Sequence, residues 1–258
     1  MNRPTTIQEV LDQLDLIIAD SVDSNDRLGL FAYVYRRTTA EILKEIQLEN
    51  FEDNRRMEKM DVIFANLYLD AYNGNKNNKK ISKSWEFAFV NKNKRLTILQ
   101  HIMMGINAHI NLDLAIATSS VMFGKELSDI EKDFNKVNDI LFNITNEIQD
   151  KLSRVSRLLF LLDIIGKKSD EKVIDFSMRK AREQAWNSAN LLWALEPDHQ
   201  SDAIIEIDSV VLQLSNILAS PKSRFIRFVL QAIQKFEEKD VGIIISKLTE
   251  EKITHNNK

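Results

Sequence analysis

Residues 98–123, ILQHIMMGINAHINLDLAIATSSVMF, decide the fold. The stretch is long enough to cross a bilayer as a helix, but the histidine, asparagine and aspartate side chains near its middle would be costly in lipid. A helix buried inside a water-soluble protein is the simpler interpretation. We therefore expect a central helix at about 96–123, with the other helices packed around it.

The composition predicts an all-α fold. Six glycines and three prolines in 258 residues are too few for a fold with many strands. With 44% hydrophobic and 28% charged residues, the chain has an ordinary globular composition. We expect residues 1–258 to form a single compact multi-helix bundle.

Capping signals predict where two helices begin. Thr5 with Gln8, and Ser128 with Glu131, have the spacing of capping boxes. The first is expected to open a helix that ends near residue 19, and the second a long helix that ends near residue 165.

Apolar residues at helical spacing predict the remaining helices. Pro221 is expected in the first turn of the helix predicted at 221–236. Residues 73–84 are expected to form a mobile loop. The run SKSWEFAFV, residues 82–90, could include a short extended segment. The tail of about 250–258 is expected to fray. The predicted helices are 26–48, 54–72, 170–195, 201–218 and 221–236.

Charge and cysteine content narrow the classes of partner. With 35 basic and 38 acidic residues the net charge is -3, so no long-range field attracts nucleic acid, and we expect no nucleic-acid partner. The absence of cysteine excludes disulfides and thiolate sites and fits a reducing compartment. The N-terminal residues lack the pattern of a secretory signal, so a cytoplasmic location is expected.

Four polar residues of the central helix form the candidate catalytic group. His109 and Asp113 are four apart, which in an α-helix leaves an angular offset of only about 40°, so both can bind one target. Asn107 and Asn111 form a second such pair. Polar groups buried without partners cost on the order of 1 to 3 kcal/mol each. The cluster is therefore either a site facing a pocket or a closed hydrogen-bond network that fixes helix register.

Other helices offer partners for this cluster. Asp61 and Asp70, in MEKMDVIFANLYLDAY, could join His109 and Asp113 as ligands of a divalent metal such as zinc. Arg182 and Trp186, also four apart, could hold a phosphate or carboxylate of a cofactor or ligand. The alternative for that helix is a solvated face carrying an Arg179–Glu183 pair.

The strings MMGINAHINLDLAIA, MDVIFANLYLDAY and RKAREQAWNSANLLWAL resemble an uncharacterised family of bacterial all-helical proteins. That resemblance implies a fold and no activity. Separately, the Gly105, His109 and Asp113 spacing resembles the zinc helix of bacterial phospholipase C and related single-strand nucleases. This second resemblance implies that His109 and Asp113 bind a metal that activates water against a phosphoester. With four histidines in the chain, at most a one- or two-metal site rich in carboxylates could form.

Two functions remain open from the sequence. The first is an enzyme with a polar pocket that acts on a small or lipidic substrate. Metal-assisted hydrolysis at His109 and Asp113 is the reaction that this hypothesis favours. The second is a non-catalytic binding or scaffold protein whose buried cluster is structural. A metal-free acid–base role for His109, oriented by Asp113, ranks below both. No membrane span is expected, and a homo-oligomer is compatible with the sequence.

Overall fold

The computed structural model describes residues 3–156, 158 and 178–250. Within these ranges every regular element is a helix, which confirms the all-α bundle. Besides short 3-10 turns at Asn91–Asn93 and Leu127–Ile130, the elements are α1 (Ile7–Asp23), α2 (Leu28–Gln47), α3 (Asn54–Lys76), α4 (Lys83–Val90), α5 (Ile98–Ala108), a π-helical segment (His109–Asp113), α6 (Leu114–Val121), α7 (Glu131–Val155), α9 (Met178–Ala194), α10 (Pro197–Ala219), α11 (Arg224–Phe236) and α12 (Val241–Thr249).

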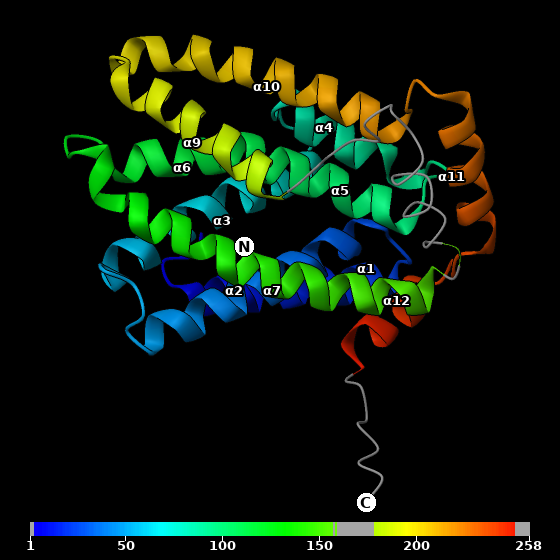
Figure 1. Cartoon of the computed structure of the whole chain (residues 1–258). Helices are drawn as coiled ribbons and strands as arrows, with labels where there is room; N and C mark the ends of the chain where they lie inside the picture. Colours follow the sequence, from blue (N-terminus) through cyan, green and yellow to red (C-terminus); the bar gives the residue numbers. More distant parts are fainter. Residues whose placement is uncertain (1–2, 157, 159–177, 251–258) are drawn as a thin grey trace, which may run out of the picture.

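The predicted central helix is confirmed as one continuous rod from α5 through the π-helical segment to α6. Figure 1 shows it running across the middle of the molecule, with α9 and α10 on one side and α1 and α2 on the other. Thr97 caps its N-terminus in a capping box with Gln100. Its buried apolar residues contact both halves of the core, so the other helices pack around it.

A close approach between α5 and α2 depends on Gly105. A β-carbon at this position would lie 2.4 Å from the ring of Phe31, well inside van der Waals contact. Phe31 belongs to the buried aromatic core, so its ring has little room to move.

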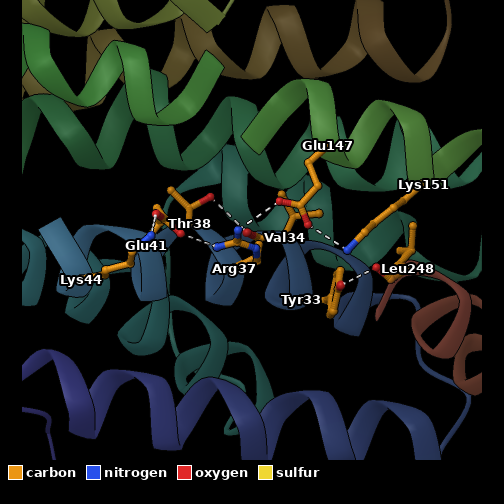
Figure 2. Close-up of polar contacts among 9 residues, drawn as sticks. All are labelled: Tyr33, Val34, Arg37, Thr38, Glu41, Lys44, Glu147, Lys151 and Leu248. Atoms are coloured by element: carbon orange, nitrogen blue, oxygen red, sulfur yellow. Dashed lines mark hydrogen bonds and ion pairs between the residues drawn. The ribbon is translucent and has the colours of Figure 1, made fainter. Parts of the chain in front are cut away.

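Polar contacts fasten α7 and α12 to α2 at the surface (Figure 2). Arg37 of α2 donates to Glu41 on its own helix and to Glu147 of α7, both at 3.0 Å. Tyr33 of α2 donates its hydroxyl to the carbonyl oxygen of Leu248 in α12, at 2.7 Å. These pairs are partly exposed, so we assign them to positioning rather than to much stability.

Two predicted helix starts are wrong. Thr6, not Thr5, caps α1, because its side chain accepts from the backbone of Glu9 and Glu9 reaches back to it. Ser128 lies within a 3-10 turn, and α7 begins at Glu131 without a side-chain cap.

Other boundaries also differ from the predictions. α11 begins at Arg224 with Ser223 as its cap, so Pro221 precedes the helix, whereas Pro197 occupies the first turn of α10. The expected loop 73–84 is shorter, because α3 continues to residue 76 and α4 begins at residue 83. SKSWEFAFV is helical because Trp85 and its neighbours bury one face of α4. The helix predicted to end near 165 ends earlier, because α7 stops at Val155 with Ser156 as its C-cap. The start expected near 170 and the tail from 251 lie outside the described residues.

We expect Gly105→Ala to lower the free energy of unfolding by about 1–3 kcal/mol, since the added methyl group overpacks Phe31 and outweighs a gain of about 1 kcal/mol in helix propensity. Urea unfolding measures the change. Phe31→Leu in the same chain should recover part of the loss, and a double mutant no more stable than the sum of the single effects would contradict this packing account.

Candidate functional site

The centre of the candidate site is the π-helical segment of the central helix. In a π-helix the hydrogen bonds run from residue i to i+5, so one turn is wider than in an α-helix, and such turns occur frequently at functional sites. Here the Nδ1 atom of His109 lies 2.9 Å from the Oδ2 atom of Asp113. The two side chains therefore bind each other, whereas the α-helical spacing had favoured joint binding of a third group.

A third residue completes this network from outside the central helix. Trp85 of α4 donates its indole N–H to the same Oδ2 atom of Asp113, at 2.9 Å. His109 and Asp113 are only 2% and 3% exposed, and Trp85 is equally buried. α4 is in turn held by Asp208 of α10, whose carboxylate accepts from the backbone N–H groups of Lys83 and Ser84 at its N-terminus.

Aromatic rings enclose the imidazole of His109. Phe64 stacks on it with ring centroids 3.6 Å apart and planes 8° from parallel, and Tyr35 meets it edge-on at 4.4 Å. Three further rings lie within 6.0 Å, those of Phe31, Tyr68 and Trp85. This enclosure favours an uncharged imidazole.

Burial favours the uncharged form of both side chains in the His109–Asp113 pair. It lowers the pKa of His109 well below its ordinary value. It raises the pKa of Asp113 well above its ordinary value, although the Trp85 hydrogen bond opposes this. The pair is therefore neutral as a whole.

Nε2 of His109 and Oδ2 of Asp61 are buried and have no hydrogen-bond partner among the described residues. The ring of Tyr35 contacts His109, and the Tyr35 hydroxyl interacts with the side chain of Thr39. Burial raises the pKa of the Tyr35 phenol, and the charge of Asp61 adds to this effect, so the carboxyl group lies near the phenol. Burial also raises the pKa of Asp61 to about 7.

The amide pair of the central helix has a different role from His109 and Asp113. Asn107 donates to the carbonyl oxygen of Val211 at 2.9 Å and to the hydroxyl of Ser215 at 2.8 Å, both in α10. Asn111 donates to the side-chain oxygen of Asn107 at 2.9 Å. The two asparagines thus join the central helix to α10.

The predicted metal ligands do not come together. Asp70 lies at the surface, where its carboxylate, 57% exposed, pairs with Arg3 at 3.2 Å. Among the residues that the structure describes, no three His, Asp or Glu side chains are arranged to hold a metal ion. The donor set of His109, Asp113, Asp61 and Asp70 therefore does not fit a zinc centre. Helical periodicity already places Asp61 and Asp70, which are nine residues apart, on opposite faces of α3.

Arg182 and Trp186 of α9 point into the core. Arg182 donates to the side chain of Asn138 at 2.6 Å and to the carbonyl oxygen of Phe134 at 2.5 Å, and its guanidinium lies over the ring of Phe134. Trp186 packs against the same ring. Burial lowers the pKa of Arg182 to about 9, so it stays charged at neutral pH. For Arg182 the structure supports neither a solvated face nor an anion site; the residue fastens α9 to α7.

A small cavity lies beside the site, and the sequence did not predict it. It measures about 20 Å³, room for a water molecule. Three rings that contact His109, those of Phe31, Tyr68 and Trp85, also line this cavity, whereas His109 does not. His101 lines it too, and burial, helped by the charge of Arg27, lowers the pKa of His101 to about 4.

Comparison with known proteins places these features in a family. Residues 7–221 match a family described as "Family of unknown function (DUF5995)". The chain belongs to this family. The three strings noted in the sequence lie inside the matched span of DUF5995, which confirms the expected kinship with an uncharacterised all-helical family, and the His109–Asp113–Trp85 network lies there as well. No curated protein and no solved structure matches the chain.

Among the residues that the structure describes, no single helix is both long and apolar enough to cross a bilayer. Within the described residues, α10 and α11 would together be long and apolar enough, but they are bent by 70° relative to each other.

We expect Trp85→Phe to lower the free energy of unfolding by about 1–3 kcal/mol, because Oδ2 of Asp113 loses a buried donor. Trp193→Phe is the matched control, since the indole of Trp193 donates to the carbonyl oxygen of Lys125 at a more exposed position. Guanidinium unfolding of both variants measures the difference. Equal losses in the two variants would contradict a special role for the Asp113 contact.

Asp61 should make stability depend on pH. A carboxyl whose pKa is raised on folding stabilises the folded state below its unfolded pKa, near 4, and this contribution is lost as the pH rises toward 7. Asp61→Asn should therefore gain little at pH 4 and about 1 kcal/mol or more relative to wild type at pH 8. Unfolding at both pH values measures this, with Asp70→Asn as the control. A gain that is the same at both pH values would argue against it.

Proposed function

We propose that the chain is a non-catalytic binding protein, in which the polar network of the central helix holds the bundle together and the partner surface lies elsewhere. One observation carries this proposal: the imidazole of His109 is 2% exposed and enclosed by aromatic rings. A hydrolase must bring substrate and water to its base, whereas this ring is sealed from both.

The contacts of the network support a structural role. Oδ2 of Asp113 accepts from Trp85 and bonds to His109, and Asn107 reaches two groups of α10. Together they join α4, the central helix and α10. Because each group loses its hydration on burial, removing one member leaves the others unsatisfied, and such networks fix a single packing arrangement.

A metal-free acid–base function is the second candidate, and a specific observation favours it. Nε2 of His109 carries no partner among the described residues, the ring of Tyr35 contacts the imidazole, and the charge of Asp61 acts on the Tyr35 phenol. With Asp113 on Nδ1, this is the arrangement of a base held in one orientation. Use of that base would require the rings of Tyr35 and Phe64 to separate.

We expect His109→Ala to lower the free energy of unfolding by about 2 kcal/mol or more, because Asp113 would lose its buried partner. Urea unfolding measures this, together with the zinc content of both proteins after loading and dialysis. A stable variant would contradict the structural network and favour the acid–base candidate. Stoichiometric zinc in the wild type that is lost in the variant would contradict both functions.

A further inference from the structure

Helix α11 has an apolar outer face that no described residue covers. Its inner face buries Ile226, Val229 and Ile233. On the outside, Phe225, Phe228 and Phe236 are 61%, 68% and 64% exposed. Their helical spacing places the three rings along one stripe, with Ala232 between them. Large exposed apolar stripes of this kind mark interaction surfaces.

Basic residues flank this aromatic stripe. Helix α11 contains Arg224, Arg227 and Lys235 and no acidic residue, and the exposed Lys222 precedes it. The surface is thus locally positive, although the chain as a whole has a net charge of -3.

Helix α11 lies at the periphery of the part of the molecule that the structure describes. The helix is bent by 70° from α10 and stands at one edge of the molecule, across the ends of other helices (Figure 1). Three acidic residues follow it and have partners elsewhere, of which Asp240 caps α12. Glu237 is buried on Ser156 and the backbone of Ile98, and Glu238 pairs with Lys247.

We propose that the outer face of α11 binds the surface of an anionic lipid bilayer, with its phenylalanine rings in the interface and its lysines and arginines on the head groups. A helix that combines an aromatic face with basic flanks lies in the plane of such an interface. A second copy of this chain fits less well, because a symmetric contact would bring Arg224 and Lys235 against the same charges of the partner.

This proposal rests on the binding function proposed above and names its partner. The surface lies beyond residue 221, where the match to DUF5995 ends, and none of its residues belongs to the His109 network. The two proposals can therefore fail separately.

Flotation of the full-length protein with vesicles tests the proposal, using phosphatidylcholine alone and phosphatidylcholine with 30% phosphatidylserine. We expect binding to the anionic vesicles only, weakened by salt. Phe225→Ser with Phe228→Ser, and separately Arg224→Glu with Lys235→Glu, should each weaken this binding about tenfold or more. The matched controls are Phe123→Ser, an exposed ring beyond the end of α6, and Lys79→Glu with Lys80→Glu, which makes the same change in net charge.

Urea unfolding and size-exclusion chromatography of every variant complete the experiment. Wild-type stability in the α11 variants, with binding lost, supports the proposal. Absence of wild-type binding, or equal binding by the α11 variants and their controls, would overturn it. It would also be overturned by a wild-type dimer that the phenylalanine variant abolishes while no vesicle binding is seen. If His109→Ala proves stable yet floats normally, the network account fails and the lipid surface stands.

Discussion

A single carboxylate oxygen, Oδ2 of Asp113, joins the parts of the core on which the rest of the structure depends. It accepts the indole N–H of Trp85 and meets Nδ1 of His109, both at 2.9 Å. A charge at this depth would be costly, so burial favours a neutral pair and requires that both contacts be kept. The aromatic rings pack around this pair, and α4 and the central helix are fixed relative to each other.

The pair lies within the π-helical turn, and Asn107 extends the polar contacts to α10. Side chains of the central helix thus hydrogen-bond to α4 at Asp113 and to α10 at Asn107. We therefore assign two roles to two parts of the molecule. The polar residues of the central helix hold the core together, and the exposed face of α11 is the proposed partner surface.

The central helix and the all-α class could be predicted from the apolar content of residues 98–123. The site could not, because a spacing of four places His109 and Asp113 on one face without deciding whether they bind each other or a third group. Asp61 and Asp70 look alike in sequence, yet one is buried and the other pairs with Arg3, which depends on the rotation of α3 in the bundle. The role of Trp85 depends on a tertiary contact with Asp113, which the sequence around Trp85 does not predict.

Nitrogen-15 NMR of the imidazole of His109, assigned with a His109→Asn variant and followed from pH 5 to 8, tests the central claim most directly. The account predicts that both ring nitrogens keep constant chemical shifts over this range, because burial holds the pair neutral. A titration of His109 near pH 6.5, the ordinary value for histidine, would show a ring that water reaches and would contradict a sealed network.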